Sequence, residues 1–310
     1  MPKSEFHGDT LDFQASNPSE RLDVFLSREA GIGTRSYAAK LVKDGFVSVN
    51  GKPAKAAQAI SAGDFVRVFV ASSPPPRAED LPLTVLYEDE DILVVDKPAG
   101  MVVHPAPGHP EHTLVNALLA RHPELGGIDA VRPGIVHRLD KDTSGLMVVA
   151  LNAGSREWLI AQFKTGAVHK EYLALVAGQP DDCGVIEGPI GRHPIHRKRM
   201  AVVPGGKPAV TRFTVVERLG AFALVLAQPV TGRTHQLRVH LHHVGHPIAG
   251  DRVYGGRHWW RPLEDMLPRH FLHAALLSFR PPHSSNAATF SSQLPPDLQQ
   301  ALETARRIAA

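Results

Sequence analysis

A charged turn lies between two apolar runs in residues 134–150, whose sequence is GIVHRLDKDTSGLMVVA. The first run leads to His137, Arg138 and Asp140, and the second begins at Leu146. Two apolar runs around a polar turn predict two buried strands joined at the protein surface. Such a turn holds a carboxylate at the edge of a cleft with a cation beside it. Asp140 is therefore the first candidate for a functional residue.

Length and composition limit the class of protein. A chain of 310 residues suits two domains, and 43% hydrophobic with 21% charged residues is ordinary for a globular protein. No stretch approaches the roughly 18 apolar residues of a membrane span, and the first 14 residues contain no apolar run typical of a secretory signal. The single cysteine, Cys183, excludes a disulfide framework and a cysteine-rich zinc site. We expect a cytoplasmic monomer that does not associate with membranes.

The charge is unevenly distributed along the chain. Residues 188–250 contain nine lysines or arginines and one acid, Glu217, so this segment carries +8 in a protein of net charge +3. Residues 18–70 form a second surplus, with eight basic residues against five acidic ones. Two basic blocks in a nearly neutral chain indicate a polyanionic partner that is contacted at two places.

Changes in composition divide the chain into five segments. They are a disordered tail (1–17), a small module (18–71), a proline-rich linker (72–82), a large domain (83–283) and a C-terminal tail (284–310) with a helix near 296–308. In the small module, a short amphipathic helix starts at Leu22 and a second one runs from Ser36 to Gly45. An Asn50-Gly51 hairpin turn and a closing strand at 65–70 complete this module.

Strands outnumber helices in the large domain. We predict strands at 83–87, 92–95, 134–137, 146–151, 171–177, 209–217, 222–228 and 236–241, and helices at 112–121 and 154–164. Many hairpins and few helices predict an α+β fold with a mixed, mostly antiparallel sheet.

The small module contains, in order, the segments RLDVFL (21–26), 36–45, VSVNG (47–51) and Gly63-Asp64. In this order they resemble the S4 RNA-binding domain, and the resemblance implies that the module binds structured RNA. Its basic side chains would contact phosphates and the RNA minor groove. On the second helix and the hairpin these side chains are Arg35, Lys40, Lys43, Lys52 and Lys55.

Five more segments accompany the 134–150 run in the large domain. They are DKPAGMVVHP (96–105), KEYLA (170–174), PVTGRTHQLRVH (229–240), GDRVYG (250–255) and LHA (272–274). Together they resemble the RluA family of pseudouridine synthases over most of residues 83–280. The resemblance implies the pseudouridine synthase fold, and it implies that Asp140, in the His-Arg-Leu-Asp sequence of the central motif, is the catalytic residue.

Pseudouridine formation breaks the N-glycosidic bond of a uridine, rotates the uracil and rejoins it through carbon 5. Nothing is oxidised or hydrolysed, so we expect no cofactor. An ionised carboxylate can act as the nucleophile, or as a base and electrostatic stabiliser. In a sheltered cleft it needs a nearby cation, because burial alone raises its pKa.

The resemblance gives roles to three further side chains. It implies that Arg233 is the cation paired with Asp140, and that Tyr172 lies against the flipped base. Flipping the base out of its stack costs on the order of a few kcal/mol. Arg138 resembles an arginine that fills the space which the base vacates.

Histidines crowd the segment 235–246, which suggests a metal site at first sight. On the predicted strand, however, His240 and His242 share a face that His243 does not, and no acid lies between residues 219 and 250. We therefore predict no bound metal. The basic run at 192–199, with Arg197, Lys198 and Arg199, is flanked by glycine and proline and predicts an RNA-facing loop that orders on contact.

An S4 module joined to this set of motifs most resembles the RluD-type enzymes, which modify the RNA of the large ribosomal subunit. We therefore expect ribosomal RNA, or its precursor, as the partner. Transfer RNA is an alternative substrate for the same enzyme class. A non-catalytic RNA-binding or ribosome assembly factor is a second alternative, but it predicts damage to the set Asp140, Tyr172 and Arg233, and all three are present.

Overall fold

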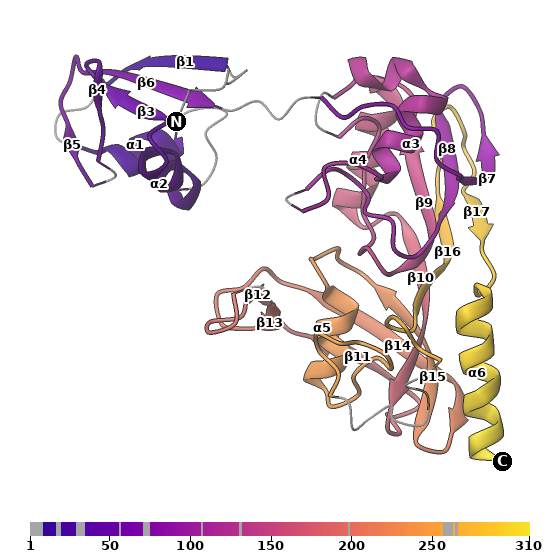
Figure 1. The fold of residues 1–310 in the computed structure, drawn as a ribbon. Coiled ribbons are helices and arrows are strands. Elements are labelled where there is room, and N and C mark those ends of the chain that lie inside the picture. Colours follow the sequence, from indigo (N-terminus) through magenta and orange to yellow (C-terminus); the bar gives the residue numbers. More distant parts are fainter. Residues whose placement is uncertain are drawn as a thin grey trace. The chain divides into compact units, whose positions relative to one another are not determined.

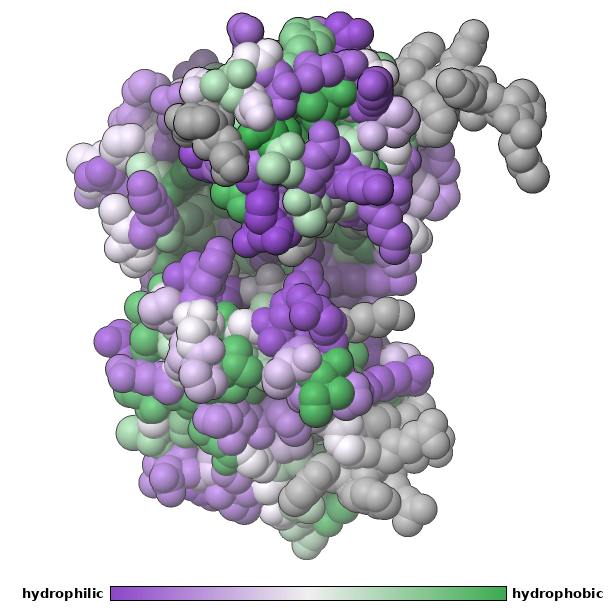
Figure 2. All heavy atoms as spheres, turned by 90° about the vertical axis from the view of Figure 1, so that its left-hand side faces the viewer, coloured by the Kyte–Doolittle hydropathy of each residue, from purple (hydrophilic) through white to green (hydrophobic). Residues whose placement is uncertain are grey.

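The chain divides into two compact units, Met1–Pro75 and Pro76–Ala310. The computed structural model describes residues 9–16, 20–28, 35–55, 57–70, 75–106, 108–129, 132–197, 199–256, 263 and 266–310. In this part of the chain, no helix has the length and apolar character needed to cross a membrane. On the face shown in Figure 2, hydrophobic side chains form separate patches among hydrophilic ones.

The first unit combines two helices with a small antiparallel sheet (Figure 1). In the described residues the sheet order is β1 (Asp9–Gln14), β6 (Phe65–Val70), β3 (Val47–Val49) and β4 (Lys52–Pro53). The helices are α1 (Leu22–Arg28) and α2 (Arg35–Lys43), and the short strands β2 (Glu20–Arg21) and β5 (Ala59–Ile60) pair with each other. Both predicted helices and the hairpin are thus present.

The core of this unit follows from helical spacing. Ala38, Leu41 and Val42 are buried on α2, while Lys40 and Lys43 are exposed on its other side. Residues 9–14, which we predicted to be part of a disordered tail, instead form β1 and pair along the whole of β6. Only Leu11 and Phe13 of β1 contact the core, and two apolar side chains are too weak a pattern for a strand prediction.

The second unit is built on a mixed sheet (Figure 1). Within the described residues its path is β11 (Cys183–Glu187), β14 (Val210–Leu219), β15 (Phe222–Pro229), β10 (His169–Ala177), β16 (Leu272–Phe279), β9 (Ser144–Ala150), β8 (Ile92–Lys97) and β7 (Thr84–Glu88), with β17 (Ala288–Ser291) beside β16. The β9–β16 pair is parallel and the other neighbours are antiparallel. The predicted α+β fold with a mostly antiparallel sheet is confirmed. A separate hairpin joins β12 (Ile190–Arg192) to β13 (Met200–Val202).

Four α-helices cover this sheet in the described part of the unit, and a 3-10 helix, η1 (Pro123–Gly127), follows the first of them. They are α3 (Leu114–Arg121), α4 (Ala153–Thr165), α5 (Gln236–His243) and α6 (Pro296–Ala309). Thr113 and Asn116 form a capping box on α3, and Asn152 caps α4, so polar residues define where both helices begin. Helices α5 and α6 lie on opposite sides of the sheet (Figure 1).

Two predicted strands are wrong. Residues 236–241 form the helix α5, in which all six side chains are buried, so the alternation of apolar residues at 237, 239 and 241 does not define one face. Residues 134–137 form a turn with one isolated bridge, from Ile135 to Val149. Gly134 has φ +67°, and a Cβ there would lie 2.6 Å from the carbonyl oxygen of Ala150.

The predicted C-terminal tail belongs to the second unit. Leu298, Ala301, Leu302 and Ala305 recur at helical spacing on α6 and are buried in the core formed with β10 and β15. Part of the predicted linker (72–82) also belongs to the second unit, which begins at Pro76. There, Glu79 donates its backbone N–H to the carbonyl of Asn116, near the start of α3. Polar composition around these segments concealed their packing.

Gly145 gives a test of how the sheet holds the charged turn. It has φ +113°, and a Cβ would lie 2.3 Å from the carbonyl oxygen of Ala274 on β16. We expect Gly145→Ala to lower the free energy of unfolding by about 2–4 kcal/mol in denaturant titration, because backbone must move. Gly126→Ala is the control, since its nearest atom is at 3.8 Å and its φ is not positive. Equal effects of the two substitutions would contradict this account.

Candidate active site

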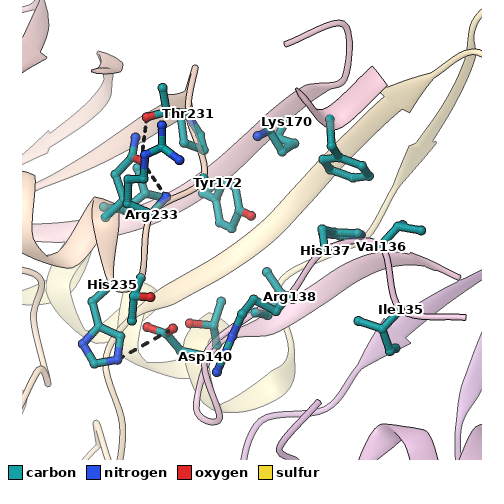
Figure 3. A pocket seen from close by; sticks show the side chains of 18 of the residues that line it. Ile135, Val136, His137, Arg138, Asp140, Lys170, Tyr172, Thr231, Arg233 and His235 are labelled. Atoms are coloured by element: carbon teal, nitrogen blue, oxygen red, sulfur yellow. Dashed lines mark hydrogen bonds and ion pairs between the residues drawn. The ribbon is translucent and has the colours of Figure 1, made fainter. Parts of the chain in front are cut away.

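A pocket of about 550 Å³ lies where the charged turn meets β10 and the segment before α5 (Figure 3). Its walls include Asp140, Tyr172, Arg233 and Arg138. The structure thus brings together residues from three regions of the sequence, at 138–140, 172 and 233. Tyr172 packs against both large cores of the unit, so the pocket lies between the two halves of the sheet. Its volume is within the roughly 300–1,000 Å³ of small-ligand sites.

A buried lysine, Lys97, binds the backbone of the turn that carries Asp140. The ammonium group of Lys97, at the end of β8, donates hydrogen bonds to the carbonyl oxygens of Pro98 (2.7 Å), Met101 (3.0 Å) and Lys141 (3.1 Å). The backbone N–H of Thr143 closes the turn on the carbonyl of Asp140 at 3.1 Å. The carboxylate therefore sits on a fixed support.

Arg238 is the cation paired with Asp140. Its Nη1 lies 2.9 Å from Oδ2 of Asp140, while Nε and Nη2 donate to the two oxygens of Asp251 at 2.7 and 3.0 Å. The side chain of Arg238 is 8% exposed and that of Asp251 is fully buried. Asp251 also accepts the backbone N–H groups of Val253 and Tyr254. This bidentate anchor fixes the direction in which the third nitrogen points.

The predicted pairing of Arg233 with Asp140 is wrong. The exposed side chain of Arg233 donates from Nε to the carbonyl oxygen of Pro208 at 3.0 Å, although it does line the pocket. The reason is the helix: α5 begins at Gln236 and turns Arg238 inward, whereas Arg233 lies before the helix. The sequence did contain a signal for Arg238, which lies between apolar residues in QLRVHL (236–241). An arginine among buried residues needs a buried anion.

Opposing effects set the ionisation of Asp140. Burial would raise the pKa of Asp140, but the positive charges of His235 and Arg238 and the Arg238 hydrogen bond together hold it below its usual value. Burial also lowers the pKa of His235, which favours its neutral form at pH 7. Arg238 cannot lose its proton, so we assign the ionised state of Asp140 mainly to Arg238.

His235 and Tyr254 complete the wall beside Asp140. His235 adopts φ +56° at the start of α5, with Nε2 3.9 Å from Oδ1 of Asp140 and Nδ1 2.8 Å from the hydroxyl of Tyr254. The guanidinium of Arg238 lies 5.1 Å from the centre of the Tyr254 ring. The motif at 250–255 gave no role to its residues, and the positions of Asp251, Tyr254 and His235 around Asp140 and Arg238 were not predicted.

Tyr172 comes from the centre of β10. The pairing of β10 with β16 shifts register between Glu171 and Tyr172, and the ring of Tyr172 points into the pocket (Figure 3). Burial, and to a lesser degree the negative charge of Asp140, raises its pKa above the usual value. No described residue forms a hydrogen bond with its hydroxyl group. A protonated hydroxyl is therefore available to a ligand.

The other predicted RNA contacts lie on the surface. Arg138 is exposed at the pocket and has no ion-pair partner among the described residues. Arg197 and Arg199 are exposed on the β12–β13 hairpin, whereas Lys198 lies outside the described residues. Lys40, Lys43, Lys52 and Lys55 are exposed on the first unit. Arg35 is also exposed, and it forms an ion pair with Asp23 at 3.0 Å.

The crowded histidines point in different directions. His240 is buried and bonds Thr211 and the carbonyl of Gly188, and His246 bonds the carbonyl of Ala177. Among the described residues, no group of three or more His, Cys, Asp or Glu side chains has an arrangement suited to a metal ion. In this part of the chain the ring nitrogens of His240 and His246 instead bind hydroxyl and backbone oxygens.

The fold and the pocket define a small-ligand site beside an ionised carboxylate, and sequence comparison identifies the class of protein. The family described as RNA pseudouridylate synthase matches residues 91–243, and the S4 domain family matches residues 20–66. The chain belongs to the RNA pseudouridine synthase family and carries an S4 domain ahead of the catalytic unit.

Relatives of similar length support this conclusion. An RNA pseudouridine synthase of Chloroflexus aurantiacus is 47% identical over 91% of this chain and 88% of the relative, and one of Bacillus subtilis is 45% identical over 96% and 98%. The ribosomal large subunit pseudouridine synthase D of Nitrosomonas europaea is 42% identical over 93% and 85%. The solved structure of human RNA pseudouridylate synthase domain containing 1 matches 72% of this chain and 89% of its own, with a TM-score of 0.58 and 31% identity.

The two arginines predict different pH profiles. If Arg238 keeps Asp140 ionised, Arg238→Gln should raise the pKa of Asp140 and move the acidic limb of the kcat/KM profile to higher pH by about one unit or more. Arg233→Gln is the matched control and should leave that limb unchanged. A shift in Arg233→Gln without one in Arg238→Gln would contradict the pairing seen in the structure.

Proposed function

We propose that this enzyme converts specific uridines of large-subunit ribosomal RNA to pseudouridine, with Asp140 as the nucleophile after the base has flipped out. The observation that carries the proposal is the Asp140–Arg238–Asp251 arrangement. It offers an ionised carboxylate at a pocket wall, held by a cation that is itself fixed by a buried acid. The pocket supplies no second carboxylate among its lining residues, so one acid has to serve throughout.

In the reaction the bond between C1′ and N1 breaks, the uracil rotates, and a bond between C1′ and C5 forms. The C5 proton leaves and N1 gains one, so no external reactant is consumed. A carboxylate that stays ionised can attack and then depart, and it can also take the C5 proton. Because the pKa of Tyr172 is raised, its hydroxyl is suited to holding the ring by contact and hydrogen bonding, and poorly suited to acting as a phenolate base.

The rim of the pocket suits a flipped nucleotide. Arg138 lies two residues before Asp140 and is exposed. It has no ion-pair partner among the described residues, so its guanidinium is able to contact RNA. We assign it to the space that the base leaves in the RNA stack, where a guanidinium can stack and bond at the same time.

Ribosomal RNA as the substrate is supported by the relatives. Three of them, from Nitrosomonas europaea, Pseudomonas aeruginosa and Xanthomonas campestris, are called ribosomal large subunit pseudouridine synthase D and are 40–42% identical to this chain. The exposed lysines of the S4 unit add a second contact with structured RNA. Tethering at two places raises the effective concentration of the pocket near its target.

Asp140→Asn tests the proposed nucleophile. The amide is nearly isosteric but cannot attack, so pseudouridine formation on transcribed large-subunit ribosomal RNA should fall by at least roughly 10³-fold. RNA binding should stay within a few-fold of that of the unchanged protein. Pseudouridine formation by Asp140→Asn would refute the mechanism. Pseudouridine formation by the unchanged protein on transfer RNA but not on ribosomal RNA would refute the proposed substrate.

The double variant Lys40→Ala, Lys43→Ala tests the S4 contact. Loss of two phosphate contacts should weaken RNA binding and reduce the slope of log K against log salt by about 0.7–0.9 per contact. Arg67→Ala is the matched control in the same unit, because Arg67 is already paired with Asp12 at 2.8 Å. An unchanged salt slope in the double variant would contradict RNA binding by this helix face.

A further inference from the structure

Lys170 occupies a part of the pocket that the mechanism above does not use. It lies on β10 two residues before Tyr172, so both side chains leave the same face of the strand. Their Cα atoms are about 6.6 Å apart along an extended strand. Figure 3 shows the amine of Lys170 on the same side of the pocket as Tyr172, while Asp140 lies across from it.

The surroundings of Lys170 are apolar. Its amine lies 5.8 Å from the centre of the Phe163 ring, and His137 stacks on the same ring at 4.6 Å between centroids. His137 is occupied in turn, since its Nε2 accepts the backbone N–H of Val148 at 3.0 Å. A cation over a ring gains some stabilisation, but far less than from a full negative charge.

Lys170 has no anionic partner in the described part of the chain. Neither a carboxylate within 4 Å nor a hydrogen-bond acceptor contacts its amine. The adjacent acid, Glu171, lies on the other face of β10 and is bound by His169 and Gln228, each at 2.9 Å. Consistent with this isolation, burial lowers the pKa of Lys170 below its usual value. A partly buried lysine without a partner destabilises the free protein, which is typical of a group kept for a ligand.

Other side chains that line the same pocket add positive charge. Lys164 and Arg132 line the same pocket, and both are exposed. The acid that lines the pocket, Asp140, is already paired with Arg238. An incoming ligand therefore has to bring its own negative charge to this end of the pocket, and the full negative charges of RNA are its phosphates.

We propose that Lys170 binds a backbone phosphate of the RNA next to the flipped uridine, in a subsite beyond Tyr172. This inference rests on the proposed function, because it assumes an RNA strand that enters the pocket beside Asp140. Lys170 thus fixes the strand while Asp140 acts on the sugar or base.

Lys170→Met and Lys170→Arg test this subsite, both made in the Asp140→Asn background so that bound RNA is not turned over. The probe is a transcribed large-subunit ribosomal RNA fragment whose phosphates have been ethylated at random. Fragments bound and unbound by the protein are separated, and the phosphates whose neutralisation blocks binding are mapped. With Lys170 present we expect blocked positions beside the modified uridine, and one of them should disappear in Lys170→Met and persist in Lys170→Arg.

Thermal unfolding supplies an independent readout. Lys170→Met removes an unpaired cation and should leave Tm unchanged or raise it, while RNA affinity falls about 5- to 20-fold and the salt slope drops by about 0.7. Lys164→Met is the matched control, since it removes an exposed lysine of the same pocket and should leave the Lys170-dependent position blocked.

Two results would overturn the proposal. One is a lower Tm in Lys170→Met with unchanged RNA affinity, which indicates a structural lysine. The other is an unchanged ethylation pattern with a loss of kcat in Lys170→Met and Lys170→Arg made without the Asp140 change, which indicates a contact with the base or a proton transfer. Failure of the proposed function differs from both, because the unchanged protein would then neither bind nor modify this RNA.

Discussion

Arg238 determines how the active site of this enzyme is held together. It divides its guanidinium between two acids, giving two hydrogen bonds to buried Asp251 and one to Asp140 at the pocket wall. Burying three charged groups is costly, and the cost is offset only when donors and acceptors are matched as they are here. Removing Asp251 would therefore affect Asp140 without touching it. The ionised state of Asp140 thus depends on Arg238, and the position of Arg238 depends on the buried Asp251.

Two more buried basic side chains hold the same turn. Lys97 binds the carbonyl of Lys141, and Arg269 binds the carbonyl of Asp142 at 2.8 Å and the hydroxyl of Ser144 at 3.2 Å. Arg269 also forms an ion pair with Asp297, at the start of α6, at 2.7 Å. The backbone around Asp140 is thus fixed from several sides before substrate arrives. Such preorganisation is what allows a carboxylate to act in a sheltered site without first moving its surroundings.

The sequence predicted the elements whose signal is local. Asp140 was identified from a polar turn between apolar runs, and the helices predicted at 112–121 and 154–164 correspond to α3 and α4. The elements missed were those whose identity depends on tertiary packing. The first six residues of helix α5 are all buried, so the apolar residues among them do not mark one helical face, and β1 relies on its pairing with β6. Arg238 was not considered as the partner of Asp140, because residues 236–241 were predicted to be a strand and not the helix that turns Arg238 inward.

The two lysines of the site show why burial alone does not identify a functional residue. Lys97 is fully buried, and three carbonyl oxygens accept its hydrogen bonds, so its amine serves the fold. Lys170 is less buried, but it faces a ring and an open pocket with no described acceptor. The cost of partly burying a cation without an acceptor is offset when a ligand supplies the negative charge. What distinguishes the two lysines is the unmet hydrogen-bonding capacity of Lys170, and that property becomes visible only when the three-dimensional partners of each side chain are known.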